Sequence, residues 1–554
     1  MDKKKFMALA ALALTITGAV LYSYRMDIAM NLRQRELARQ IGPNVPVNWQ
    51  SGPAQAAQPA AERPPNIVFI LADDLGINDI STFGGGVADG AVPTPNIDRL
   101  AKQGALFSQS YAGHATCAPS RAMLMTGRYP TRTGFEFTPT RPGFGRLVAE
   151  FSAAIDSGLP LRTFDPEIEA GRPPYNEMGL PVEEVTIAEV LKQRGYHNVH
   201  IGKWHLGGAR PFHPIDQGFD ESLLMESLLH LPEGDPDVVN AKLDFDPIDK
   251  TLWKISNFST SYNAGPKFAP GGYLSDYWTD EALKVIEANK NRPFFLYLAH
   301  WGVHTPLQAT RADYEAVGDI KPHRLRVYAA MVRALDRSVG RVMNKLEAEG
   351  LADNTIFVFS SDNGGANYLG LPDVNNPYRG WKLTFFEGGL RAPIFIKWPA
   401  RIKPETVIDT PVAHIDIMPT LAAAANAPLP EGVAIDGRNL LPLATGSGTI
   451  QRDNDALFWQ SGYTRVVRAG DWKLHYEGKR DKSWLFNLAD DPTEQNNLAA
   501  TQPEKLKQLR TILDAHKAAS RGPLYPAATN TPVAIDKTLA DYFTDKDEFV
   551  WYQN

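Results

Sequence analysis

Cys117 is the only cysteine in the chain, and its neighbours indicate chemistry. A single cysteine forms no intrachain disulfide, and a lone cysteine is usually a small buried apolar side chain. Here, however, Pro119 lies where a helix is predicted to begin, so the amides of the first turn point toward Cys117 and attract an anion. Arg121, four residues after Cys117, adds a guanidinium that can grip a tetrahedral oxyanion at two points. The segment is predicted to be an anion pocket containing a soft nucleophile.

Four other polar groups each follow a short apolar run, the pattern expected where buried strands end. Any one of them alone could be a solvated loop. Because parallel strands end at one edge of a sheet, where open α/β folds bind ligands, we expect the four groups to meet in one cleft. The groups are Asp73 with Asp74, Lys203 with His205, His300 with His304, and Asp362 with Asn363.

Asp73, Asp74, Asp362 and Asn363 offer hard oxygen ligands. Three crowded carboxylates repel one another unless a cation or a proton compensates. Oxygen ligands without a thiolate or imidazole favour calcium or magnesium over zinc. The alternative is that the first pair caps a helix and the second makes a turn. Lys203 and His205 are two residues apart, so an extended segment projects both to the same side.

The elements that position these groups are typical of an α/β fold. The apolar runs at residues 67–71, 199–201, 294–298, 356–359 and 394–396 alternate with helical patterns, which predicts a large, mostly parallel sheet sandwiched by helices. Thr94-Pro95 and the capping box of Thr186 with Glu189 mark helix starts. A longer apolar stripe predicts a helix over about residues 324–350.

The chain ends differently. Beyond about residue 450, short strand-like pieces predict a small antiparallel unit covered by a helix from about Pro503 to Lys517, followed by an irregular aromatic tail. The predicted division is a catalytic α/β domain over residues 65–450 and a small α+β subdomain with its tail over residues 451–554. Segments near residues 135–181 and 253–273 are expected to be long loops beside the active edge, where they would shape a pocket or simply pack.

The N-terminus resembles an export signal. Three lysines precede an uncharged stretch at residues 6–24, so residues 1–25 are predicted to be a signal peptide or a membrane anchor. The lysines should stay inside, which places the body in the periplasm or outside the cell. Residues 26–64, rich in Pro and Ala, are predicted to be an extended linker. The formal net charge of −6 is small for 554 residues and argues against a nucleic-acid partner.

At this point a family resemblance is plain. Cys117-Ala118-Pro119-Ser120-Arg121 resembles the sulfatase signature, whose cysteine is oxidised to formylglycine by a dedicated maturation enzyme. Residues 195–207, ending in Lys203-Trp204-His205-Leu206-Gly207, resemble the second signature, with Asn198 where Ser or Thr is usual. Residues 376–391, which contain Lys382, are similar to the family's late lysine segment, and residues 485–494 to its closing strand and turn. The resemblance covers residues 65–500 and implies the alkaline phosphatase superfamily.

The resemblance also implies a mechanism and a site. One Ca²⁺ would be held by Asp73, Asp74, Asp362, Asn363 and the matured residue 117. One hydroxyl of the hydrated formylglycine would attack sulfur while the cation, Arg121, Lys203 and Lys382 hold the sulfate. His304, with Lys382 near the ester oxygen, would protonate the leaving alcohol, and His205 would take a proton from the second hydroxyl. His114 and His300 are expected to be packing residues.

The expected substrate is a small-molecule or glycan sulfate ester, aryl or carbohydrate. Two alternatives stay open. One is a phosphonate or phosphate ester hydrolase of the same superfamily, because both substrates are tetrahedral oxyanions. The other is a non-catalytic protein that binds sulfated glycans, which would leave Cys117 unmodified.

Overall fold

The structure is a computed structural model that describes residues 34–226 and 228–554. The predicted signal or anchor at residues 1–25 lies outside this range and stays a prediction. Within the range, no helix combines the length and the apolar character needed to cross a membrane.

A ten-stranded mixed sheet forms the centre of the fold. Its four central strands, β12, β1, β10 and β5, run parallel, which confirms the predicted α/β class. The apolar run at residues 394–396 was expected in the parallel part, but its strand pairs antiparallel with β12. In spatial order the strands are β14 (Thr406–Ile408), β2 (Ala105–Phe107), β13 (Ile394–Lys397), β12 (Thr355–Ser361), β1 (Asn66–Ala72), β10 (Phe294–Ala299), β5 (His197–Gly202), β6 (Glu221–Met225), β8 (Thr260–Tyr262) and β9 (Lys267–Phe268).

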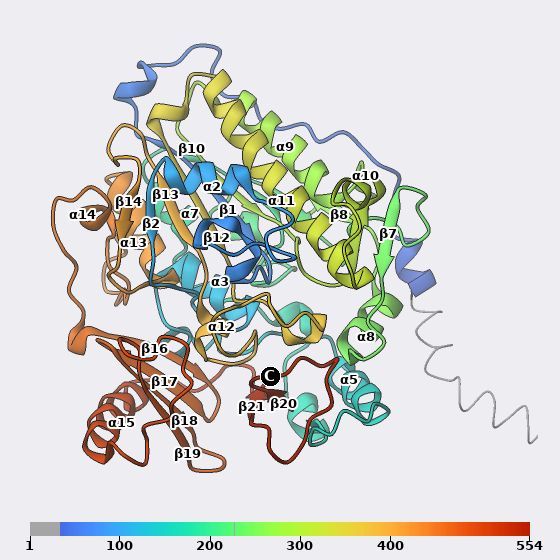
Figure 1. The fold of residues 1–554 in the computed structure, drawn as a ribbon. Coiled ribbons are helices and arrows are strands. Elements are labelled where there is room, and N and C mark those ends of the chain that lie inside the picture. The colour runs from blue at the N-terminus through green and yellow to red at the C-terminus, as the bar shows by residue number, and fades with distance from the viewer. Residues whose placement is uncertain (1–33, 227) are drawn as a thin grey trace, which may run out of the picture.

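Strand β1 shows why the central runs are apolar throughout. All seven of its residues are buried, and successive side chains enter different cores. Val68 and Ile70 pack in the core that contains α9 (Leu274–Asn289) and α11 (His323–Ala348). Phe69 packs in the opposite core with α7 (Ile187–Lys192) and α13 (Ile417–Ala424). Helices therefore cover both faces of the sheet (Figure 1).

The predicted helix signals have mixed outcomes. The capping box forms as expected, with the Thr186 hydroxyl accepting from Glu189 N–H and the Glu189 carboxylate accepting from Thr186 N–H. Helix α2 (Pro95–Lys102) does begin after Thr94, but the Thr94 side chain makes no cap bond. Instead Asp336 of α11 accepts from the first-turn amides of Asn96 and Ile97. The cap thus comes from another helix, which local sequence could not reveal.

The chain beyond residue 450 forms two units. A four-stranded antiparallel sheet is covered by α15 (Pro503–Ala518), as predicted. The tail is not irregular: β20 (Thr529–Ala534) and β21 (Phe549–Gln553) form an antiparallel hairpin, here called the terminal hairpin, and β20 also pairs with β4 (Thr163–Phe164). In Figure 1 both lie below the main body, with the sheet at the lower left and the hairpin nearer the middle. The sheet strands are β16 (Ala456–Ser461), β17 (Thr464–Ala469), β18 (Trp472–Glu477) and β19 (Lys482–Asn487).

Three segments expected to be linker or loop are built into the body. Residues 42–64 contain one short 3-10 helix, η1 (Ala60–Glu62), and contact the body: Trp49 donates its indole N–H to Glu281 of α9 at 2.7 Å. The segment at residues 135–181 contains α5 (Phe144–Ala153), α6 (Pro166–Ala170) and β4, so the expectation of a long loop was wrong. The third segment likewise contributes α8 (Pro247–Ile255), β8 and β9.

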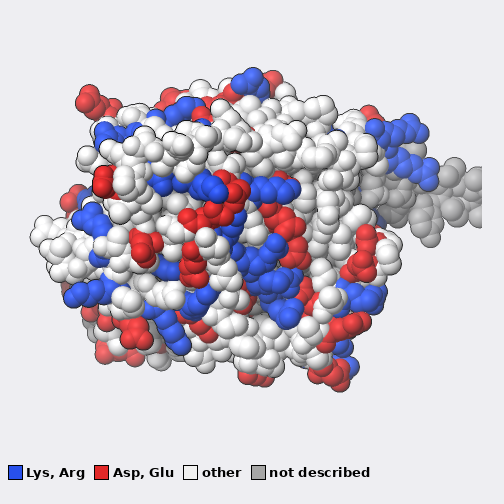
Figure 2. All heavy atoms as spheres, turned by 90° about the horizontal axis from the view of Figure 1, so that it is seen from above, with Lys and Arg blue, Asp and Glu red and all other residues white. Residues whose placement is uncertain are grey.

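The surface seen in Figure 2 carries acidic and basic side chains intermingled rather than gathered by sign. Ion pairs between α9 and α11 are part of this pattern. Arg337 pairs with Asp276, and Lys345 pairs with Glu287. Such a surface is consistent with the small net charge of the chain.

Candidate active site

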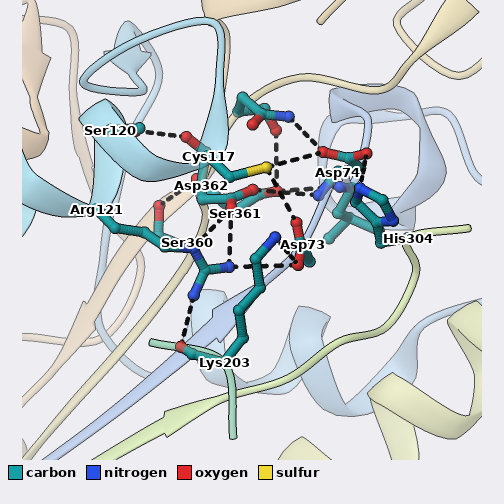
Figure 3. Close-up of polar contacts among 12 residues, drawn as sticks. Asp73, Asp74, Cys117, Ser120, Arg121, Lys203, His304, Ser360, Ser361 and Asp362 are labelled. Carbon is teal, nitrogen blue, oxygen red and sulfur yellow. Dashed lines mark hydrogen bonds and ion pairs between the residues drawn. The ribbon is translucent and has the colours of Figure 1, made fainter. Parts of the chain in front are cut away.

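The four polar groups do meet at one edge of the central sheet (Figure 3). Asp73 and Asp74 follow β1, Asp362 and Asn363 follow β12, Lys203 follows β5 and His304 lies five residues beyond β10. Because these strands are parallel neighbours, their carboxyl ends place residues that are far apart in sequence within hydrogen-bonding distance.

Helix α3 (Cys117–Thr126) brings the cysteine to this edge. The helix begins at Cys117 itself, so Pro119 is the third helical residue rather than the first. The Cys117 thiol lies 3.6 Å from Asp73 Oδ1 and 3.9 Å from Asp74 Oδ1. Ser120 fixes the first turn by donating to the Asp362 carbonyl at 2.5 Å. The nucleophile candidate and the aspartate pair therefore share one buried pocket.

Arg121 is fully buried and uses its fork on protein groups rather than on an open pocket. Its Nε donates to Asp362 Oδ2 at 2.9 Å, a second nitrogen lies 2.8 Å from the same oxygen, and a third donates to the Lys203 carbonyl at 3.0 Å. The two-point grip of this guanidinium on an oxyanion stays a prediction. Its observed two-point contact joins α3 to the ends of β12 and β5.

Two lysines neutralise the aspartate pair. Lys203 Nζ lies 2.6 Å from Asp73 Oδ2, and Lys382 Nζ lies 2.7 Å from Asp74 Oδ1. Tyr368 joins them by donating to Asp74 Oδ2 at 2.6 Å and accepting from Lys382 at 3.1 Å. Tyr368 was not predicted from the sequence, where its position five residues after Asn363 is the one local signal for it.

The histidines divide into two kinds. His304 is in the site: its Nδ1 lies 2.6 Å from the Thr305 carbonyl, its Nε2 lies 3.5 Å from Asp74 Oδ2, and its ring stacks on Trp301. His205, held at a positive φ of 64°, has a buried Nδ1 that lacks a hydrogen-bond partner in the described part of the chain. His300 and His114 bond to Ser338 and to the Gln460 carbonyl, in agreement with their expected packing role.

Burial and charge set the protonation of the cluster. Burial and the neighbouring Asp362 raise the pKa of Asp73 to about 7, which outweighs Lys203. Burial opposes ionisation of Asp362 too, but Arg121 lowers its pKa to about 2. Burial raises the pKa of the Cys117 thiol well above its usual value. Burial lowers the pKa of both His205 and His304, so both imidazoles are neutral at neutral pH.

This grouping can hold a metal ion. One ligand atom each from Asp73, Asp74, Cys117 and His304 lies within 4.8 Å of the others. Asn363 Oδ1 is buried and accepts no hydrogen bond from any described residue, while its amide donates to Asp74 Oδ1 at 2.7 Å. An unpartnered buried carbonyl beside carboxylates is what a hard cation would satisfy. Asp362 is not in this group of four; its Oδ2 accepts from Arg121, and its Oδ1 accepts from the Asp74 amide at 3.2 Å.

Comparison with known proteins agrees with this site. Residues 65–427 match the family described as Sulfatase, and residues 380–519 match the one described as N-sulphoglucosamine sulphohydrolase, C-terminal. Steryl-sulfatase of Mus musculus is 30% identical, covering 84% of this chain and 84% of its own. N-acetylgalactosamine-6-O-sulfatase of Bacteroides thetaiotaomicron is 30% identical, covering 82% of this chain and 93% of its own.

A similar solved structure is that of Ps i-CgsB, with a TM-score of 0.66 and 29% identity over 83% of this chain and 94% of that one. The same protein has been solved in complex with k-i-k-neocarrahexaose. The mixed, mostly parallel sheet and its likeness to this structure give the chain the fold of the alkaline phosphatase superfamily, with a buried group that could hold a metal ion at the carboxyl edge of the sheet. Within it the chain belongs to the sulfatase family and is an enzyme of the sulfuric ester hydrolase class.

Proposed function

We propose that this sulfatase hydrolyses the sulfate ester of a carbohydrate or an aryl alcohol, with Cys117 converted to formylglycine as its nucleophile. The observation that carries the proposal is the position of Cys117. Its sulfur lies 3.6 Å from Asp73 within a buried cluster of three carboxylates and three cationic side chains. A thiol with a raised pKa is a poor nucleophile by itself. The surroundings suit a different group at position 117.

Asp73, Asp74, Asp362 and Asn363, together with residue 117, would hold one calcium ion. When bound, the ion would neutralise the carboxylates and stabilise negative charge on a sulfate oxygen. The donor set supports this assignment, since Asn363 Oδ1 is unpartnered and Asp73 resists ionisation without a cation. Lys203 and Lys382 now pair with Asp73 and Asp74. Once a cation shares these carboxylates, both lysines have ammonium hydrogens to offer to sulfate oxygens.

A hydrated formylglycine would supply two hydroxyls on one carbon, one to attack sulfur and one to release it. Arg121 keeps that carbon in place indirectly, because it ties the first turn of α3 to Asp362 and to the Lys203 backbone. Lys203 also lies 4.7 Å above the Trp301 ring, which limits where its ammonium can move. These contacts would limit the directions from which the hydroxyl could attack.

The two neutral histidines have one usable nitrogen each. His205 Nδ1 has no partner among the described residues, so it can accept a proton at that atom. His304 donates through Nδ1 to the Thr305 carbonyl, so its neutral ring has no proton on Nε2. Nε2 would first have to take up a proton, and it could then give that proton to the leaving alcohol. Asp74 lies 3.5 Å from that Nε2 and favours its protonation against the effect of burial.

The substrate class rests on the relatives. They include a steryl-sulfatase and an N-acetylgalactosamine-6-O-sulfatase, and the structural neighbour was solved with k-i-k-neocarrahexaose. We propose that the substrate is a small-molecule or glycan sulfate ester. We also propose that the enzyme is exported to the periplasm or outside the cell, and that residues 6–24 are either cleaved off or kept as a membrane anchor. A formylglycine-generating enzyme would convert Cys117. The first 33 residues are outside the described range.

The test is a desulfation screen of matured protein against aryl, steroid and monosaccharide sulfates, with calcium present and after chelation. Peptide mass spectrometry must first measure the fraction of Cys117 that is converted, and Cys117→Ala is the matched control. We expect calcium-dependent release of sulfate by matured protein only. A clear preference for an aryl phosphate or a phosphonate monoester would make the chain a phosphorus ester hydrolase instead. Unmodified Cys117 in protein from its native host, with glycan binding but no turnover, would indicate a non-catalytic binder.

A further inference from the structure

The terminal hairpin reaches the residue next to the nucleophile. Thr116 immediately precedes Cys117, and its hydroxyl donates to the Tyr552 hydroxyl of β21 at 2.8 Å. Both residues are buried. The hairpin begins after residue 519, where the second family match ends. A contact from the far end of the chain therefore lies directly beside the catalytic position.

This contact changes how helix α3 begins. Thr116 is the N-cap residue of α3, and a threonine there normally accepts a hydrogen bond from an amide of the first turn. Thr116 makes no such bond, because its hydroxyl faces Tyr552 instead. Pro119 has no N–H to offer, so the only amide that Thr116 could cap is that of Ala118.

The result is an open helix end. The amides of Cys117 and Ala118 have no hydrogen-bond partner in residues 34–226 and 228–554. Free amides at a helix N-terminus are the groups that bind a tetrahedral oxyanion. A threonine hydroxyl that capped Ala118 would compete with a sulfate oxygen for that same amide.

Tyr552 is held firmly enough to keep Thr116 turned away. Its ring packs with Phe386, Trp484 and Val550 in a buried cluster. The neighbouring Gln553 accepts from the Tyr463 amide at 2.9 Å, and Asp536, in the loop of the hairpin, pairs with Arg379 at 2.6 Å. The hairpin is thus fastened on both sides of the contact.

We propose that Tyr552 is a positioning residue that holds the Thr116 hydroxyl away from helix α3, so that the helix end stays free for the sulfate group of the substrate. This inference rests on the proposed function. Tyr552 acts only through Thr116. It therefore affects the binding of the sulfate group and makes no contact with the leaving alcohol.

The test is a four-member cycle of wild type, Tyr552→Phe, Thr116→Val and the double variant, with rates expressed per matured protein. Tyr552→Phe should lower kcat/KM about five-fold, the effect of one lost hydrogen bond, by the same factor for an aryl and a carbohydrate sulfate. Valine has the shape of threonine without the hydroxyl, so Thr116→Val should stay near wild type and the double variant should recover. Tyr463→Phe is the matched control, because its hydroxyl bonds to Asn530 of the same hairpin away from Cys117.

Several results would overturn the inference. These are a Tyr552→Phe enzyme with wild-type kinetics, a loss that Thr116→Val does not restore, or an equal loss in Tyr463→Phe, which would indicate general destabilisation. If the loss of kcat/KM in Tyr552→Phe differed between the aryl and the carbohydrate sulfate, Tyr552 would instead contact the leaving group of the substrate. If matured wild type releases no sulfate from any ester, the proposed function fails, and that outcome is distinct from all of these.

Discussion

Two buried charge clusters in this protein differ in how completely they are satisfied. The site cluster consists of Asp73, Asp74 and Asp362 with Arg121, Lys203 and Lys382. The interface cluster consists of Glu387, Arg391, Lys473 and Glu494, between α12 (Glu387–Leu390) and the four-stranded sheet.

In the interface cluster every buried polar side-chain atom has a partner. Glu387 Oε1 lies 2.7 Å from Lys473, and its Oε2 lies 2.6 Å from Arg391. Glu494 accepts from Lys473 at 2.9 Å and from the Glu387 amide at 2.6 Å. Such a network holds two parts of the chain together and has nothing left to offer a ligand.

The site cluster has unsatisfied neighbours. Asn363 Oδ1 and His205 Nδ1, which lie outside the cluster as defined, lack partners within the described residues, and Asp73 is crowded by Asp362. Each cluster contains as many acidic as basic side chains, but only the site cluster has such unpartnered atoms beside it. The comparison teaches that buried charge alone does not distinguish the site from a structural network, and that the two clusters differ in the unpartnered atoms beside them.

The largest difference between the site and the interface cluster should appear when the proposed nucleophile is removed. Cys117→Ala should reduce sulfate ester turnover by about 10⁴-fold or more, since no other residue here replaces it. The melting temperature should change little, because the deleted sulfur is small. Steady-state kinetics and thermal unfolding of the same preparation check this. Residual turnover above a hundredth of wild type would contradict the assignment.

A substitution in the interface cluster should have the opposite effect, a large loss of stability with little loss of turnover. Glu387→Gln leaves Lys473 and Arg391 without their full charge partner, and removing one member of a buried pair costs about 3–5 kcal/mol of unfolding free energy. The folded fraction should keep turnover within about ten-fold. Urea unfolding measures the change. Arg210→Gln, in an exposed pair with Asp216, is the control and should cost under about 1 kcal/mol.

Calcium should stabilise the folded protein by binding at the site cluster, and the interface cluster should not contribute to this gain. At a hundred-fold excess over its Kd, a bound ion adds about 2.7 kcal/mol to the stability of the folded state. We expect this gain, followed by thermal shift, in wild type and in Glu387→Gln, and its absence in Asn363→Ala. An equal shift from magnesium, or an unchanged shift in Asn363→Ala, would argue against the proposed ligand set.

The smallest expected effect is that of pH on the stability difference between wild type and Glu387→Gln. Burial opposes ionisation of Glu387, but Lys473 and Arg391 lower its pKa well below the usual value. A group with a depressed folded pKa contributes stability that is present above its unfolded pKa of about 4.3 and is lost as pH falls through the folded value. The stability gap between wild type and Glu387→Gln should thus stay within about 0.5 kcal/mol from pH 8 to pH 6. Urea unfolding at several pH values tests this, and a gap that closed near pH 6 would refute it.

The sequence determined much of the fold and most of the candidate site. Fully apolar runs such as residues 67–71 predicted buried parallel strands, because only a sheet covered on both faces tolerates them. Polar residues directly after those runs could then be placed at one edge, which brought Asp73, Lys203, His304 and Asp362 together without knowledge of contacts. The signature around Cys117 identified the family, because those residues are consecutive in the chain.

Only the tertiary structure decided what depends on contacts between distant segments. Tyr368, the cap that Asp336 places on α2, and the grip of Arg121 on Asp362 all join separate elements. The terminal hairpin was predicted to be an irregular tail, and this was wrong, because β20 and β21 are joined by the long loop at residues 535–548 rather than by a recognisable tight turn. Hydrogen-bond partners are set by packing in three dimensions, and a one-dimensional pattern contains no direct record of them.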